Sequence, residues 1–170
     1  DDPSATLTAA TPARAGEALA GPKARDVWRK LTRTDLSSAS FPWLSAKQID
    51  VNLAPSVAAR VNFVGELGWE LHHPIEYQNH IFDALMSAGV EFGLKPFGIR
   101  AMDAMRLEKS YRMVGTEMSI EYAALESGLD RFVQLQKPDF IGRSGLLAWQ
   151  ANGFANSFVT LAVKGTTDRD

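Results

Sequence analysis

The sequence predicts an α+β fold in which a mixed sheet packs with helices. Apolar residues alternate with a period of two in Val57–Val64 and Trp69–His73, as in half-buried strands. In Glu76–Met86 and Ile99–Lys109 they recur at helical spacing. Strands and helices do not alternate regularly along the chain, which argues against a doubly wound parallel sheet.

The first half of the chain is expected to hold one helix and a pair of strands followed by a return strand. Pro22 suits the first turn of a helix, and Pro42 ends any helix that begins at Asp35. Glu17–Gly21 is expected only as an apolar approach to a turn. The expected elements are a helix at Pro22–Leu31, an irregular segment at Asp35–Leu44, strands at Ile49–Leu53 and Val57–Val64 around a turn at Ala54–Ser56, a turn at Gly65–Gly68 and a strand at Trp69–His73.

Glycines delimit the elements expected in the second half, because glycine is the common residue just after a helix. The expected elements are helices at Glu76–Met86, Ile99–Lys109, Glu121–Ser127 and Ser144–Ala151, and strands at Arg131–Leu135 and Phe158–Val163. The chain starts without methionine, and only seven polar residues follow its last expected strand. We therefore expect both ends to be cut from a longer protein.

Composition excludes several classes of protein and site. The chain has 170 residues, 45% of them hydrophobic and 22% charged, which is typical of one globular domain or parts of two small ones. A net charge of −2 with scattered Lys and Arg predicts no nucleic-acid partner. No apolar stretch is long enough to cross a membrane. Without cysteine there is no disulfide, no thiolate nucleophile and no cysteine-based zinc site.

Glu70 is the first candidate for ligand binding. In the return strand, Trp69, Leu71 and His73 share one face. Glu70 and His72 share the other face. If the Trp69 face is the core, Glu70 faces a second layer or a cleft, where its two oxygens suit the paired donors of a pterin or guanine edge. The alternative, which spacing alone favours, is a solvent-facing residue, because isolated glutamates are mostly exposed.

Three charged residues follow one stripe of the expected helix Ile99–Lys109. Arg100, Asp103 and Arg106 are spaced three apart. Alternating sign usually marks an exposed, self-paired face of a helix. In the functional interpretation, Asp103 orients an arginine, and Arg100 near the helix start points toward an anionic or polar ligand.

Metal, dinucleotide and hydrolase sites are not indicated. His72 and His73 are adjacent in a strand and point to opposite faces, so they do not chelate one ion simply. His80 has no matching ligand one helical turn later, and we expect no metal. Glu66 is interpreted as a solvated carboxylate in the GELG turn, although glycines there also permit a ligand to approach the backbone. No dinucleotide or P-loop motif occurs.

Five blocks in order resemble the glycine-cleavage T-protein (aminomethyltransferase) family. VNFVGELGWELHHP is similar to its YTGExGxE block, and LKPFGIRAMDAMRLEKSYRMVGTEMS to its GLxxxGLxARDxLRLExGxxLYGxD block. The remaining blocks are AGPKARDVWRKLT, AALESGLDRFV and KPDFIGRSGLLA. The resemblance implies part of an aminomethyltransferase-type folate-binding domain. Residues 1–156 would form that partial domain without its amino-terminal part, and residues 157–170 would start a truncated carboxyl-terminal barrel.

The resemblance also implies a cofactor site for tetrahydrofolate. The glutamate that holds the pterin edge in the family falls on Glu70, and the arginine that contacts folate falls on Arg100. A tyrosine that packs near the folate is replaced by Phe63, whose ring can still pack but whose hydroxyl bond is lost. The family's catalytic aspartate lies upstream of this segment, so no catalytic residue is expected here.

GELGWELHHP and RLEKSYRMVGTE are more similar to the branch of flavin-dependent dimethylglycine and sarcosine dehydrogenases than to the glycine-cleavage branch. In that branch, FAD belongs to a domain upstream of this segment, and a methylated amine is the substrate. The expected cellular location of the protein is the cytoplasm, or the mitochondrial matrix in a eukaryote. Two alternatives remain: a free-standing aminomethyltransferase, and a non-catalytic binding module of the same superfamily.

Overall fold

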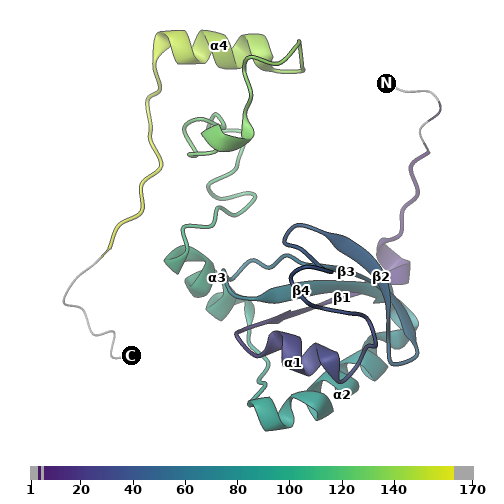
Figure 1. Ribbon diagram of the computed structural model, residues 1–170. Coiled ribbons are helices and arrows are strands. Elements are labelled where there is room, and N and C mark those ends of the chain that lie inside the picture. The colour runs from purple at the N-terminus through teal and green to yellow at the C-terminus, as the bar shows by residue number, and fades with distance from the viewer. Residues whose placement is uncertain (1–3, 5, 163–170) are drawn as a thin grey trace. The chain divides into compact units, whose positions relative to one another are not determined.

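The computed structural model describes residue 4 and residues 6–162, and contacts divide the chain into two compact units. The first unit is Asp1–Lys109 and the second is Ser110–Asp170 (Figure 1). The first unit holds a sheet and three α-helices, and the second holds one α-helix among turns. The α+β class predicted from the sequence is confirmed.

The sheet of the first unit has four strands in the order β1-β4-β3-β2, and every neighbouring pair is antiparallel. The strands are β1 (Arg14–Ala20), β2 (Ala46–Val51), β3 (Ala54–Ala59) and β4 (Gly68–Pro74). β4 is a central strand, because it pairs with β1 along its whole length and with β3 through its middle residues, from Glu70 to His72. This position buries one face of β4 and supports the backbone on both sides.

Strand β1 was missed by the sequence analysis, which expected only an approach to a turn at Glu17–Gly21. Its sequence, RAGEALA, is rich in alanine and glycine, which favour strands weakly. Pairing with β4 holds it in the sheet, with Leu19 opposite Trp69 and Ala15 opposite His73. The strand therefore depends on a partner strand whose residues lie 48 to 60 positions further along the chain.

The β2–β3 turn also differs from the expected one. It lies at Asn52-Leu53, where Asn52 has φ of 53°, a conformation that asparagine tolerates well. The expected turn residues Ala54–Ser56 begin β3 instead, so the prediction was wrong by two residues. Because the turn lies two residues earlier than expected, Ala54, Ser56 and Ala58 are on the buried face of β3. The segment Val61–Val64, which was expected to continue the strand, is a loop.

Two helices cover one face of the sheet (Figure 1). They are α1 (Ala24–Arg29), inside the expected helix Pro22–Leu31, and α2 (Gln78–Gly89), which follows the 3₁₀ turn η2 (Ile75–Tyr77). Val27 and Trp28 of α1 and Ile81 and Leu85 of α2 are buried in the core. Such packing of apolar helix stripes on a sheet supplies the main stabilisation of the unit.

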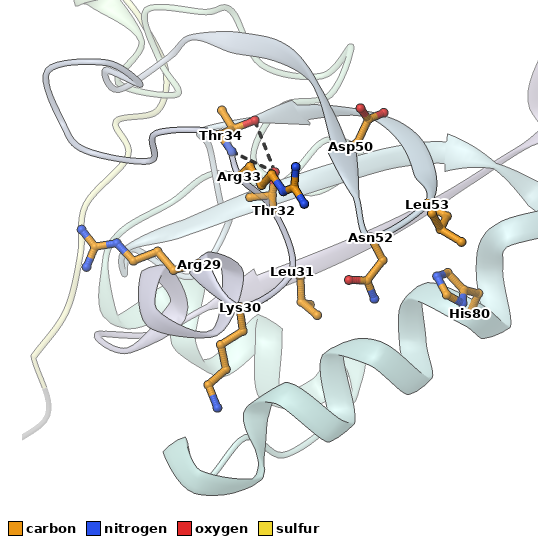
Figure 2. A pocket seen from close by; sticks show the side chains of 10 residues that line it. All are labelled: Arg29, Lys30, Leu31, Thr32, Arg33, Thr34, Asp50, Asn52, Leu53 and His80. Carbon is orange, nitrogen blue, oxygen red and sulfur yellow. Dashed lines mark hydrogen bonds between the residues drawn. The ribbon is translucent and has the colours of Figure 1, made fainter.

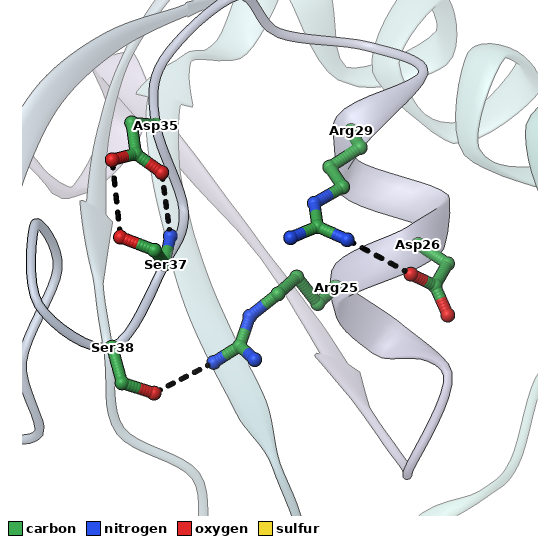
Figure 3. A network of polar contacts seen from close by, with 6 residues as sticks. All are labelled: Arg25, Asp26, Arg29, Asp35, Ser37 and Ser38. Carbon is green, nitrogen blue, oxygen red and sulfur yellow. Dashed lines mark hydrogen bonds and ion pairs between the residues drawn. The ribbon is translucent and has the colours of Figure 1, made fainter.

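Trp69 lies at the centre of this core and is 1% exposed. The ring of Phe41 meets it edge-on, with centroids 6.2 Å apart and planes at 71°. The guanidinium groups of Arg25 and Arg60 lie over the same ring at 5.7 and 5.8 Å. Both arginines also donate to the hydroxyl of Ser38 (Figure 3 shows the Arg25 bond).

The remaining helix of the first unit is α3 (Ile99–Glu108), as expected from its spacing. It follows the 3₁₀ turn η3 (Val90–Phe92), which ends at Gly93 with φ of 73°. Gly98 has extended backbone and precedes the first turn of α3. A further 3₁₀ turn, η1 (Thr11–Ala13), comes before β1.

In the second unit only one expected helix forms. It is α4 (Arg143–Asn152), ended by Gly153 with φ of 83° as predicted. The segment expected as helix Glu121–Ser127 consists of turns, and η4 (Asp130–Phe132) replaces the expected strand Arg131–Leu135. Residues 158–162 form no strand, since no described segment pairs with them as a sheet, and Val163 lies outside the described residues.

In the turns at residues 121–127, Glu126 is a buried charged residue, 5% exposed. Its carboxylate accepts hydrogen bonds from the backbone N–H groups of Ala123, at 2.9 Å, and Asn156, at 3.2 Å. The bond from Ala123, three residues earlier, closes a turn, and no regular helix follows it. Within residue 4 and residues 6–162, no helix is long and apolar enough to span a membrane.

Candidate functional site

Glu70 sits in the middle of β4, on the face of the sheet that the helices do not cover. The predicted division of β4 is confirmed, since Trp69, Leu71 and His73 are 1%, 0% and 0% exposed. Glu70 is half-buried on the opposite face. Its direct neighbours across the sheet are small side chains, Ala18 in β1 and Ala59 in β3.

Phe63 is half-buried in the loop of residues 60–67 that joins β3 to β4. The loop is organised by one side chain, that of Asn62. Its Oδ1 accepts hydrogen bonds from the backbone N–H groups of Val64, at 3.0 Å, and Glu66, at 3.2 Å. Its Nδ2 donates to the carbonyl of Glu66. Local bonding of this kind is typical of asparagine in turns.

The two glycines of GELG are used for internal packing in this unit. Gly65 has φ of 72°, and a Cβ there would overlap the side-chain stem of Lys109. At Gly68 a Cβ would lie 2.9 Å from the carbonyl oxygen of Leu19 in β1. Glycine is required where backbones approach so closely. Glu66 between them is exposed, as expected for a turn carboxylate, with Oε1 4.0 Å from Lys109 Nζ.

The charged stripe of α3 divides into one exposed and one buried arginine. Arg100, in the first turn, is exposed. Arg106 is 4% exposed, and its Nε donates to Asp103 Oδ1 at 2.7 Å. The expectation of a fully exposed, self-paired face is therefore wrong for Arg106, while Asp103 does orient an arginine. A buried guanidinium needs such a partner because desolvation of an unpaired charge is costly.

All three predicted site residues lie in the first unit, and two short links connect their elements. Phe63 precedes β4 by a few residues, so it is tied to Glu70 through the loop. Lys109, the residue just after α3, contacts that loop at Gly65. Among the described residues, no ion pair or hydrogen bond joins Glu70 to Arg100. A cleft shared by these two residues therefore stays a prediction.

Sequence reasoning missed two residues of this region, Asn62 and Lys109, and it did not predict the burial of Arg106. Asn62 stands two residues before Val64-Gly65, and an asparagine just before a glycine-containing turn is a recognisable signal for a loop with local side-chain hydrogen bonds. The burial of Arg106 and the contact of Lys109 with Gly65 carry no such local signal. They depend on how α3 and the loop pack in space.

Glu17 of β1 is a titratable residue on the opposite face of the sheet from Glu70, the face that the helices cover. Burial raises the pKa of its carboxyl above the ordinary value of 4.5, and the nearby His73 and a hydrogen bond from Gln78 oppose that shift in part. The Nδ1 of His73 donates to the carbonyl of Pro74 at 2.9 Å, which leaves its buried Nε2 without a hydrogen-bond partner. His73 is thus a core residue and not an accessible ligand.

Among the described residues, metal-ligating side chains do not gather at one point. In the part of the chain that the structure describes, no group of three or more His, Cys, Asp or Glu side chains is placed to hold a metal ion. His72 is exposed on the Glu70 face, whereas His73 is buried on the other. Their opposite orientation follows from the strand geometry used in the prediction.

A cavity of about 730 Å³ lies beside the end of α1 (Figure 2). Two of its cationic residues are already in ion pairs: Arg29 pairs with Asp26 at 3.4 Å, and Lys30 pairs with Glu91. In Figure 2, Arg29 and Lys30 extend in different directions from α1. The lining residues are Arg29, Lys30, Leu31, Thr32, Arg33, Thr34, Asp50, Asn52, Leu53 and His80.

A second cavity, of about 720 Å³, is mainly apolar and runs along β1 toward α2. Leu19, Leu85 and Phe92 are among its lining residues, and Met102 of α3 reaches it. Near α1, the carboxylate of Asp35 accepts from the backbone and hydroxyl of Ser37 (Figure 3), and these bonds lower the pKa of Asp35. Neither feature includes a predicted folate-site residue.

Comparison with known proteins shows the family. A model of the GCVT N-terminal domain matches residues 1–137. Human mitochondrial dimethylglycine dehydrogenase is 45% identical over 153 residues, which cover 89% of this chain and 18% of that protein. An aminomethyltransferase of Thermoanaerobacter sp. (strain X514) is 34% identical over 142 residues, which cover 84% of this chain and 38% of that protein.

Among solved structures, the heterotetrameric sarcosine oxidase from Corynebacterium sp. U-96 superposes with a TM-score of 0.46 at 25% identity. That superposition covers 52% of this chain and 44% of the other chain. The chain spans less than two fifths of the length of the curated relatives named above. Those relatives are enzymes, and this segment corresponds to one domain of them. The chain belongs to the family of the GCVT N-terminal domain, as its sequence blocks predicted.

Proposed function

We propose that this chain is the tetrahydrofolate-binding, one-carbon-accepting portion of a flavin-dependent oxidoreductase similar to dimethylglycine and sarcosine dehydrogenases. The observation that carries the proposal is the position of Glu70, half-buried on the uncovered face of a central strand. Trp69 and Leu71 anchor the strand in the core on either side of it. A carboxylate held this way suits the parallel N–H donors of a pterin edge.

Arg100 and Phe63 complete the proposed cofactor-binding set. Arg100 is exposed in the first turn of α3, where its guanidinium is free to meet the carboxylates of a folate glutamate tail. Phe63 offers a ring within the loop that leads into β4. No catalytic residue is assigned to this segment. In this proposal, residues 1–156 belong to the folate domain and residues 157–170 begin a barrel.

In the whole protein, an FAD domain would oxidise a methylated amine, and tetrahydrofolate bound here would accept the one-carbon unit. Confinement of a reactive carbon near its acceptor favours transfer over escape to water. The identity to dimethylglycine dehydrogenase, 45% against 34% for the aminomethyltransferase, favours the dehydrogenase branch. The mitochondrial relative supports a matrix location in a eukaryote, and a bacterial protein would be cytoplasmic.

The second candidate function is that of a free-standing aminomethyltransferase. It is supported by the match to such an enzyme over 84% of this chain. A full-length protein with a flavin domain upstream selects the dehydrogenase, and one without it selects the transferase. A non-catalytic binding module is the third candidate, and it would lack one-carbon transfer in any assay.

The experiment compares wild-type full-length protein with Glu70→Ala in a calorimetric titration with tetrahydrofolate. We expect binding to weaken by roughly 2–4 kcal/mol, because two charge-assisted hydrogen bonds are lost. Flavin reduction by dimethylglycine, followed by stopped flow, should be nearly unchanged. Glu76→Ala is the matched control, since Glu76 is exposed in η2 outside the proposed site. Equal folate affinity in wild type and Glu70→Ala would falsify the assignment.

A further inference from the structure

We propose that Asn62 is a positioning residue of the folate site, which holds the β3–β4 loop against both elements that carry the site. The inference rests on the proposed function and extends it to a residue that does not touch the folate. It follows from the contacts of Asn62, Gly65 and Lys109 within the first unit.

The loop of residues 60–67 depends on Asn62 for its shape. It makes no strand pairing, and one amide side chain satisfies three of its backbone groups, two N–H groups and one carbonyl. Val64, whose N–H is held by Asn62, is 6% exposed. The buried Val64 and the amide of Asn62 therefore fix the backbone on both sides of Phe63.

The same side chain meets the start of β4. Gly68, the first residue of β4, has no side chain, and a Cβ there would lie 3.1 Å from Asn62 Cβ. The carbonyl of Leu67 accepts from the N–H of Gly21 at 2.8 Å, which ties this end of the loop to the residue after β1. The loop thus enters β4 in a defined register, two residues before Glu70.

The far side of the loop contacts the end of α3. Because Asn62 binds the N–H and carbonyl of Glu66, it sets the backbone conformation around Gly65. Gly65 packs against the stem of Lys109, and Glu66 Oε1 lies 4.0 Å from Lys109 Nζ. Lys109 follows α3 directly, and α3 carries Arg100. A change at Asn62 is therefore expected to alter the loop that leads to Glu70 and the contact of that loop with the end of α3, the helix that carries Arg100.

Three substitutions separate positioning from general stability. Asn62→Ala removes all three hydrogen bonds. Asn62→Asp keeps an acceptor oxygen for the N–H groups of Val64 and Glu66, loses the amide donor to the Glu66 carbonyl and adds a negative charge. Asn79→Ala is the matched control, because Asn79 is an exposed residue of α2.

The test uses the full-length protein, with tetrahydrofolate affinity measured by calorimetry at a temperature well below each melting transition. We expect Asn62→Ala to raise the dissociation constant about tenfold or more and Asn62→Asp to restore most of the loss. Asn79→Ala should leave affinity within about twofold of wild type. A loss of stability alone would lower the melting temperature of Asn62→Ala without changing the affinity of the folded protein.

The outcomes separate this inference from the proposed function. If Glu70→Ala weakens binding but Asn62→Ala stays within about twofold of wild type, the positioning role is wrong and the folate site stands. If Asn62→Asp binds as poorly as Asn62→Ala, the acceptor bonds to the loop are not the means of positioning, and the inference is overturned. If neither Glu70→Ala nor Asn62→Ala changes folate affinity, the proposed function itself fails.

Discussion

Replacement of Trp69 by leucine tests the arrangement of the sheet most directly. The indole is 1% exposed and contacts the edge of Phe41, with Arg25 and Arg60 over its ring. The substitution keeps an apolar side chain on the core face of β4 and removes only the aromatic ring. The loss therefore reports how much that ring stabilises the first unit.

The magnitude follows from the contacts of the indole ring. Truncation of a buried Trp to Ala costs about 3–5 kcal/mol. Leucine retains part of that burial. It leaves Phe41 without an aromatic pair of about 0.5–1.5 kcal/mol, and two guanidinium groups without ring contacts of about 0.5–1 kcal/mol each. We expect a net loss of about 3 kcal/mol in the free energy of unfolding.

The assay is denaturant unfolding of the 170-residue chain, followed by far-ultraviolet circular dichroism and repeated as a thermal melt. A loss of this size lowers the melting temperature by about 6–12 °C in a chain this long. The control is the same substitution at Trp43, which is 52% exposed and should stay within about 0.5 kcal/mol of wild type. Equal losses at Trp69 and Trp43 would show that the face of β4 assigned to the core is wrong.

Three further predictions follow from particular residues. The pKa of Glu17 in the folded chain lies above its unfolded value of 4.5, so the protonated carboxyl stabilises the fold below pH 4.5, and this contribution is lost as pH rises through the folded pKa. Glutamine does not ionise. The stability of Glu17→Gln relative to wild type should therefore grow as pH rises above 4.5 through the raised pKa. Denaturant unfolding at several pH values measures this, and a difference that stays constant with pH contradicts it. Gly68→Ala should lower the free energy of unfolding by about 1–3 kcal/mol, since the new Cβ meets the Leu19 carbonyl at 2.9 Å, and Gly145→Ala, with nothing near its Cβ, is the control. The 170-residue chain alone should bind tetrahydrofolate weakly, because a partial set of contacts must offset the lost freedom of the ligand; a micromolar dissociation constant by calorimetry would refute this.

Local sequence pattern predicted part of the candidate site. Strand parity alone predicted that Trp69 and Leu71 enter the core and that Glu70 lies on the other face. Helical spacing predicted α3 and placed Arg100 in its first turn. Neither pattern contains the distance between β4 and α3, so the shared cleft of Glu70 and Arg100 did not follow from them.

The sequence by itself determined the family, through five blocks that match it, and the elements whose signals are local. Helices α2 and α3, the glycine that ends α4 and the two faces of β4 belong to this group, because period and glycine position are written in neighbouring residues. In the second unit the same local signals failed at Glu121–Ser127, which consists of turns.

Only the tertiary structure decided the strand order, the strand character of β1 and the burial of Arg106. β1 is built from small residues with weak strand preference, and it forms because β4 pairs with it across a long stretch of sequence. Arg106 becomes a buried member of an ion pair only once α3 packs against its surroundings. Contacts between residues distant in sequence are set by the shape of the packed core, and no local pattern of a single sequence encodes that shape directly.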